Sequence, residues 1–219
     1  GRMLSITQLG LEEDSCREVS DVGHTRTYMT DRLSIPLVET VTGAELMTPD
    51  EATAAGQLLR RLVRTTGRVR TGMGAARQDV NVSVAGGRRV EIKGVPRIPL
   101  IKALTHYEAL RQRALLDIRD TLHRRGLSLE TFDGQILDLT GMVKRTHYAP
   151  IRASVEAGGR IMAVRLPGFA GILNTEIGPD IPFARDFTGR VKVIACLDSL
   201  PNIVWSDAPG LTLANRLWE

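Results

Sequence analysis

The clearest pattern in the chain is a strict alternation of polar and apolar residues on either side of a glycine pair. Residues 77–93 read RQDVNVSVAGGRRVEIK, with valine or isoleucine at every second position around the pair. A period of two is typical of half-buried strands, and glycines between two such runs indicate a turn. The pattern therefore predicts a β-hairpin with one apolar and one polar face.

The length of the hairpin loop decides which residues lie opposite one another. A two-residue loop made of the glycine pair would set the apolar Val82 against Glu91. A three-residue loop that includes the preceding alanine pairs Asn81 with Glu91 and Asp79 with Lys93. Because only the second register keeps each face uniform, we predict the three-residue loop.

The predicted register gathers two carboxylates, an amide and a lysine on the polar face of the hairpin. These side chains are Asp79, Asn81, Glu91 and Lys93. Oxygen donors beside a lysine suit a hard divalent cation next to a phosphate group. The same residues suit an exposed sheet face with cross-strand ion pairs. The hairpin alone leaves both interpretations open.

Acidic residues also accompany two strands predicted nearer the start of the chain. The first strand covers residues 3–9 and is followed by the Glu-Glu-Asp run at 12–14. Adjacent carboxylates repel one another, which is tolerable on a solvated turn and is also how a cation site gathers negative charge. The second strand, residues 36–41, holds Glu39 between apolar neighbours, where a carboxylate needs a partner.

A helix is predicted to begin after Thr48, with proline at the first helical position and Glu51 closing a capping box. We expect it to end near Thr66, before Gly67. Helical spacing predicts a buried stripe made of Leu59, Leu62, Val63 and Thr66. Arginines on and beyond the helix fit either a phosphate-facing patch or a solvated face: Arg60, Arg61, Arg64, Arg68 and Arg70.

A long helix with apolar residues at every third or fourth position is predicted from Pro99 to Gly126, and the composition changes after it. Beyond it we expect strands at residues 136–139, 161–166 and 191–197 and helices at 148–157 and 183–187. The sequence therefore predicts an α+β fold in two domains. Residues 1–126 would combine antiparallel sheet with helices, and residues 127–219 would form a small α+β module without a catalytic constellation.

Composition narrows the functional classes. With 219 residues, 42% of them hydrophobic, the chain can bury a core. It has no long apolar run or signal-peptide pattern, so we expect a cytoplasmic protein outside the membrane. The net charge of +4 comes from an excess of arginine and favours an anionic partner. Because aromatic residues make up only 4%, any nucleic acid would be held through its backbone.

Five segments, in this order, carry a resemblance to a known family: LGLEEDSCR, DRLSIPLVETVTG, RQDVNVSV, RRVEIKGV and YEALRQRALL. With them the chain resembles the tRNA-dependent amidotransferases, specifically the archaeal E-type subunits of glutamyl-tRNA(Gln) amidotransferase, which are related to the bacterial B-type subunits. The later segment VKRTHYAPIRASVEAGGRIMAVRLPGFAG looks like the insertion domain that the E-type subunits share with bacterial aspartyl-tRNA synthetases. The B-type subunits lack this insertion.

The resemblance implies a reaction. The cradle domain of this family, here residues 1–126, uses ATP and Mg²⁺ to phosphorylate the γ-carboxylate of glutamate misacylated onto tRNA(Gln). Ammonia from a partner glutaminase, the D-type subunit of the same amidotransferase, then displaces the phosphate and gives glutaminyl-tRNA. Phosphoryl transfer to a carboxylate needs cations that neutralise the converging oxyanions, in agreement with the polar face of the hairpin.

The resemblance also implies roles for individual residues, and it favours the metal interpretation of the hairpin. The metal ligands would be Glu13, Glu39, Asp79 and Glu91. Supporting or phosphate-contacting roles would fall to Arg77, Asn81 and Lys93.

The chain departs from the family pattern in two places. The family contributes a Glu-x-His pair from an N-terminal segment, and none lies upstream of Glu12. The family's C-terminal helical and tail regions do not follow Glu219. We therefore expect a partial site that is inactive alone. Two alternatives are a non-catalytic tRNA-binding module with structural carboxylates, and a metal-dependent phosphotransferase with an unrelated substrate.

Overall fold

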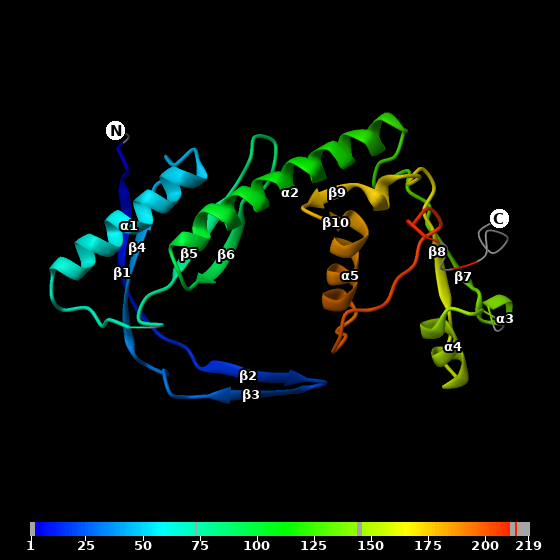
Figure 1. The fold of residues 1–219 in the computed structure, drawn as a ribbon, viewed down its shortest axis with the longest axis horizontal. Coiled ribbons are helices and arrows are strands. Elements are labelled where there is room, and N and C mark those ends of the chain that lie inside the picture. Colours follow the sequence, from blue (N-terminus) through cyan, green and yellow to red (C-terminus); the bar gives the residue numbers. More distant parts are fainter. Residues whose placement is uncertain (1–2, 73, 144–145, 211–212, 214–219) are drawn as a thin grey trace. The chain divides into compact units, whose positions relative to one another are not determined.

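The computed structural model describes residues 3–72, 74–143, 146–210 and 213. The chain divides into two compact units, residues 1–112 and 113–219 (Figure 1). Helices combine with short two-stranded antiparallel sheets in both, so the predicted α+β class is confirmed. The division falls inside a helix, whereas the sequence places the change of domain at Gly126; the domain assignments stay predictions. No described helix is long and apolar enough to cross a membrane.

Among its described residues, the first unit contains six strands, one complete helix and the beginning of a second. In chain order these elements are β1 (Ile6–Glu13), β2 (Arg17–Val22), β3 (Thr25–Met29), β4 (Pro36–Thr42), α1 (Pro49–Thr65), β5 (Gln78–Val82), β6 (Val90–Val95) and α2 (Pro99–Arg124). The remaining elements are β7 (Gln135–Asp138), α3 (Thr140–Val143), α4 (Ala149–Glu156), β8 (Met162–Arg165), η1 (Ile172–Asn174), β9 (Glu176–Gly178), β10 (Ile181–Pro182) and α5 (Phe183–Ile194).

Strands β5 and β6 form the predicted hairpin, and the predicted register is confirmed from Val82 to Val80, whereas Asp79 falls at a register shift. Asn81 lies opposite Glu91. The backbone of Gly87 donates to the carbonyl of Val84 at 2.9 Å and closes the turn. The register shifts by one residue at the far end of the hairpin, where Gly94 has a φ of 68°. Glycine adopts this left-handed conformation without a steric penalty, which explains its place at the irregularity.

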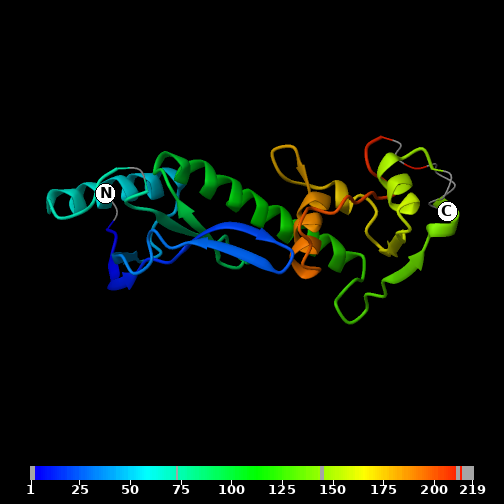
Figure 2. The same cartoon turned by 90° about the horizontal axis from the view of Figure 1, so that it is seen from below.

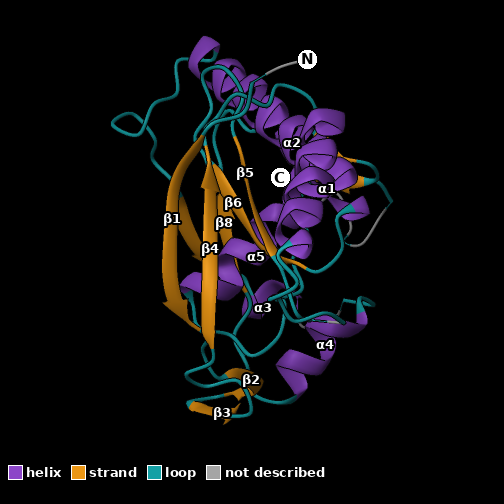
Figure 3. Ribbon diagram, turned by 90° about the vertical axis from the view of Figure 1, so that its left-hand side faces the viewer, coloured by secondary structure: helices purple, strands orange, loops and turns teal. Residues whose placement is uncertain are grey.

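The apolar face of the hairpin covers the core of the first unit. Val95, Ile98 and Ile101 are buried there, and Val80 and Ile92 pack against them. Helix α1 and the beginning of α2 lie on the opposite side of this core from the strands (Figure 3). The polar face of the hairpin therefore points away from the helices.

Helix α1 begins as predicted but packs differently. The capping box is confirmed, since the backbone of Glu51 donates to the Thr48 hydroxyl at 3.1 Å and the Glu51 carboxylate accepts from the Thr48 backbone. The predicted buried stripe is wrong, because Leu62 is 56% and Val63 41% exposed. The helix instead approaches the core through Gly56, where a Cβ would lie 3.2 Å from Ile101 Cδ1.

Two segments near the start of the chain differ from the sequence prediction. Strand β1 continues through Glu13 instead of ending at Leu9, so the first two residues of the acidic run belong to a strand. Residues 17–29, which were not predicted as strands, form the exposed ribbon β2–β3 around Gly23 and His24 (Figure 2). The ribbon escaped prediction because both of its faces are exposed, which weakens the alternation of polar and apolar residues.

The second unit has two small apolar clusters, one around Ile118, Ile172 and Ile177 and one around Val143, Ile151 and Leu213. The predicted strand at 191–197 is wrong, because helix α5 continues to Ile194. Phe183 and Phe187 pack edge to face within α5, with ring centroids 5.5 Å apart. Helical spacing prevails over the β-propensity of the valine-rich end of this segment.

Candidate functional site

The register of β1 and β4 decides which acidic side chains share a face. Gly10 lies opposite Glu39, and Glu12 lies opposite Leu37. Directly opposed residues of an antiparallel pair point to the same face, and successive residues alternate. Glu12 and Glu39 therefore share one face, and Glu13 belongs to the other.

Glu39 is the residue of this face whose pKa is raised by the acids around it. Repulsion by Glu12 is the largest cause that raises the pKa of the Glu39 carboxyl above its ordinary value. Partial burial, a hydrogen bond with Glu12 and the charge of Asp79 raise this pKa further, whereas Lys93 lowers it. Because such effects require proximity, the half-buried Glu39 lies within reach of both β1 and the hairpin.

The polar face of the hairpin supplies two further carboxylates. Lys93 Nζ lies 3.4 Å from Asp79 Oδ2 and 3.7 Å from Glu91 Oε1. The backbone of Gly94 donates to Asp79 Oδ1 at 2.7 Å and fixes that side chain. A hydrogen bond with Asp79, followed by the charge of Glu91, raises the pKa of the Lys93 ammonium. The structure thus brings together Glu39, Asp79, Glu91 and Lys93, and Asn81 lies opposite Glu91.

The structure does not bring Glu13 to this group. Its carboxylate accepts a hydrogen bond from the Ser34 hydroxyl at 2.9 Å, on the other face of the strand. Glu12 takes the position next to Glu39 that the resemblance gave to Glu13. Extending the first predicted strand by four residues would have found Glu12, since alternation then separates the two glutamates.

Asp14, the third residue of the acidic run, has a different role. Only 11% of its side chain is exposed, and its carboxylate lies 3.3 Å from Arg77 and 3.8 Å from Arg32. Its backbone donates to the carbonyl of Ile35 at 2.8 Å. Asp14 follows β1, Ile35 precedes β4 and Arg77 precedes β5. Arg77 therefore belongs to an ion pair that links the end of β1 to the starts of β4 and β5.

Gln112 of α2 holds the other end of the hairpin and has no counterpart in the sequence prediction. It is only 5% exposed. Its Nε2 donates to the carbonyl of Val82 at 3.0 Å, and its Oε1 accepts from the backbone of Val84 at 3.1 Å. Gln112 thereby satisfies the backbone groups of β5 where the strand leaves the ladder. The hydrophobic pattern of the sequence gives no signal for a glutamine that bonds to the backbone of a distant strand.

We call the following group of four acids and one lysine the carboxylate cluster: Glu12, Glu39, Asp79, Glu91 and Lys93. Only Asp79 and Glu91 make ion pairs with the lysine among the described residues. Among the described residues, no three Asp, Glu, His or Cys side chains are arranged to hold a metal ion by themselves. Mg²⁺ usually keeps several waters and takes one or two carboxylates together with phosphate oxygens. The oxygen donors and the unbalanced negative charge fit such an ion.

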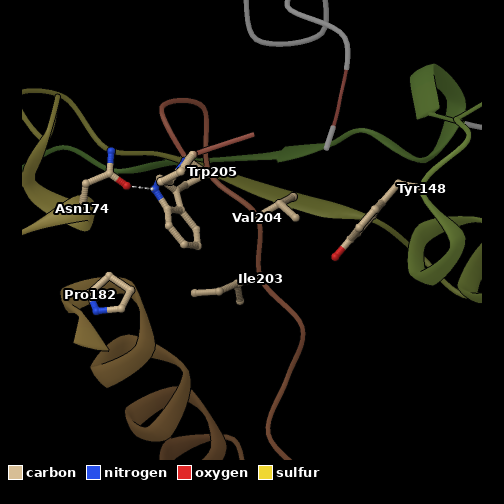
Figure 4. A pocket seen from close by; sticks show the side chains of 8 residues that line it. Tyr148, Asn174, Pro182, Ile203, Val204 and Trp205 are labelled. Atoms are coloured by element: carbon tan, nitrogen blue, oxygen red, sulfur yellow. Dashed lines mark hydrogen bonds between the residues drawn. The ribbon is translucent and has the colours of Figure 1, made fainter. Parts of the chain in front are cut away.

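An apolar pocket of about 280 Å³ lies in the second unit. Figure 4 shows Trp205 and Tyr148 on its walls, and Trp205 Nε1 donates to Asn174 Oδ1 at 2.8 Å. The Tyr148 hydroxyl is hydrogen-bonded to Asn202. The polar groups of these side chains thus bond to one another, and the lining contains no charged residue.

Residues 1–162 match the family described as GatB/GatE catalytic domain, and the chain belongs to this family. The particular relatives are E-type subunits of glutamyl-tRNA(Gln) amidotransferase. The chain is 37% identical to the one from Caldivirga maquilingensis over 218 residues, 97% of this chain and 35% of the relative. It is 38% identical to the one from Sulfolobus acidocaldarius over 211 residues, 92% of this chain and 33% of the relative.

The similarity to these archaeal E-type subunits confirms the family resemblance of the sequence. The chain spans about a third of the length of the curated relatives it matches. The likeness of residues 127–219 to an aspartyl-tRNA synthetase insertion domain stays a prediction.

Proposed function

We propose that this chain carries the Mg²⁺ and ATP site of a glutamyl-tRNA(Gln) amidotransferase. The reaction would phosphorylate the γ-carboxylate of glutamate on misacylated tRNA(Gln) and let ammonia displace the phosphate. The observation that carries the proposal is the carboxylate cluster, in which Glu12 of β1 and Asp79 of the hairpin raise the pKa of Glu39 in β4. Within the hairpin, Asp79 and Glu91 contact Lys93. A binding module with structural carboxylates would not need acids placed where they repel one another, as Glu12 and Glu39 do.

The residues of the carboxylate cluster would have two roles, which are to bind the cation and to contact phosphate. The cation would take one or two of the four carboxylates of Glu12, Glu39, Asp79 and Glu91 as direct ligands and would meet the others through its waters. It would neutralise the phosphate oxygens of ATP. Lys93, whose side chain is 71% exposed, can direct its ammonium to a phosphate oxygen while it contacts Asp79. The exposed amide of Asn81, opposite Glu91, adds a neutral donor on the same face.

Arg77 would have a supporting role, which is one of the two roles the sequence suggested for it. Its guanidinium is held by Asp14, at the point where the strands that carry Glu12, Glu39 and Asp79 meet. This ion pair would keep the carboxylates within reach of one cation. Glu13, with its carboxylate on Ser34, is left out of the proposed ligand set.

The partners follow from the names of the relatives. Each E-type relative is one part of glutamyl-tRNA(Gln) amidotransferase, an enzyme named for a charged tRNA. We propose that this chain works with misacylated tRNA(Gln) and with a glutaminase of the D type that supplies ammonia.

Two neighbouring glutamates provide a matched test. We expect Mn²⁺, used as a probe for Mg²⁺, to bind the chain, and Glu12→Gln and Glu39→Gln each to lower its affinity by more than about tenfold. Glu13→Gln removes the same charge one residue away and should leave the affinity unchanged, because Glu13 faces Ser34. Titration calorimetry measures all four proteins. Equal losses in Glu12→Gln and Glu13→Gln, or no binding by the wild type, would contradict the proposal.

A further inference from the structure

A run of arginines without acidic neighbours follows the middle of α1. Between Glu51 and Asp79 the sequence contains six arginines and no aspartate or glutamate. One of the six, Arg77, pairs with Asp14. The other five are exposed, and we call them the arginine surface: Arg60, Arg61, Arg64, Arg68 and Arg70.

The arginines within α1 share one side of the helix. Residues three and four positions apart are neighbours on a helix, so Gln57, Arg60, Arg61 and Arg64 form one face. These four side chains line a polar hollow of about 340 Å³. Gly56, through which α1 contacts the core, lies at the edge of this face, because Arg60 follows it by four positions.

Arginines on α2, by contrast, lie beside acidic residues of the same helix. Arg111 contacts Glu108 at 2.8 Å, and Arg113 contacts Asp117 at 3.2 Å. In the part of the chain that the structure describes, the arginine surface makes no ion pair. The helix dipole favours cations only in the last turn, which accounts for Arg64 but not for Arg68 or Arg70 beyond the helix. Positive charge without paired acids along residues 60–70 fits an extended anion.

We propose that the arginine surface binds the phosphate backbone of tRNA, an inference that rests on the proposed function for the identity of the RNA. Guanidinium groups contact phosphate oxygens in pairs, and successive arginines match successive phosphates of a polyanion. The nucleotide of the carboxylate cluster is not the ligand, because α1 packs on the apolar side of the hairpin and the cluster lies on its polar side.

Fluorescence anisotropy with a labelled tRNA transcript tests the surface. The slope of log affinity against log salt should be about 3 smaller in the triple variant Arg60→Gln, Arg61→Gln, Arg64→Gln, because about one counterion is released per phosphate contact. The control Arg113→Gln, Arg119→Gln, Arg190→Gln removes the same charge from arginines that pair with acids. It should keep the wild-type slope.

Three results would overturn the inference: no tRNA binding by the wild type, an equal loss of slope in both triple variants, or equal affinity for polyglutamate of the same charge. Circular dichroism and Mn²⁺ affinity of the triple variant check the fold and the carboxylate cluster. A chain that loses tRNA but keeps Mn²⁺ supports the inference. If tRNA binds through the arginines but Mn²⁺ does not bind at all, the proposed metal site is contradicted. The tRNA-binding role of the arginine surface is then still supported.

Discussion

Glu12, Glu13 and Asp14 are consecutive carboxylates with three different surroundings. The pleat of β1 sends Glu12 to the carboxylate cluster and Glu13 to Ser34. Asp14, one residue past the strand, lies between two arginines. The sequence showed a charged run, but the alternation that separates these roles depends on where the strand ends. A strand end is the least certain feature of a sequence prediction because local composition determines it weakly.

The raised pKa of Glu39 predicts a pH dependence of cation binding. A carboxyl whose pKa lies above the ordinary value keeps its proton at a pH where a free glutamate has lost it, and only the ionised form binds the cation. Mn²⁺ affinity should therefore begin to fall, as the pH is lowered, above the ordinary glutamate range. Calorimetric titrations at several pH values measure this onset.

Glu12→Gln removes the largest cause of the raised pKa of Glu39. In this variant, NMR titration of the Glu39 side chain should give a midpoint at lower pH than in the wild type. An unchanged or higher midpoint would show that Glu12 does not act on Glu39.

Among the elements, the hairpin β5–β6 was predictable and the ribbon β2–β3 was not. One buried face makes the alternation of Val80, Val82, Val90 and Ile92 unambiguous and allows a single register. The ribbon has no buried face, so its composition resembles that of a loop. Helix α1 shows the same dependence on tertiary context, because its capping box was predicted from local residues and its packing face was not.

The Asp14 ion pairs join three strands, and their loss should destabilise the first unit. Asp14→Asn keeps the shape of the side chain and removes the charge that Arg32 and Arg77 share. We expect a loss of about 1–3 kcal/mol in the free energy of unfolding, as for hydrogen bonds to charged groups. Urea denaturation gives this free energy.

The matched control is Asp21→Asn. Asp21 forms an exposed pair with Arg26 on the β2–β3 ribbon, at 3.3 Å. Exposed pairs contribute about 0–1 kcal/mol, so this variant should remain close to the wild type. If both variants lose equal stability, Asp14 has no special role in joining the strands.

At the scale of the whole molecule, hydrophobic periodicity could not predict which residues far apart in the sequence lie close together in the fold. Periodicity placed Asp79 and Glu91 on one face, but it gives no distance between that face and Glu39 of another strand pair. The family resemblance implied that these acids converge on a metal, which stays a prediction. It gave a ligand role to Glu13, whereas the structure brings Glu12 next to Glu39. Gln112 bonds to backbone groups and Asp14 pairs with arginines from distant segments, and the sequence carries no periodic signal for either.

The most direct test of the carboxylate cluster is to locate a bound cation by NMR. Mn²⁺ at substoichiometric concentration broadens the signals of amides close to it. A cation in the carboxylate cluster should cause selective loss of the amide signals of Glu12, Glu39, Asp79 and Glu91, and excess Mg²⁺ should restore them. Broadening centred on other carboxylates, such as those of residues 113–219, would contradict a metal site on these strands.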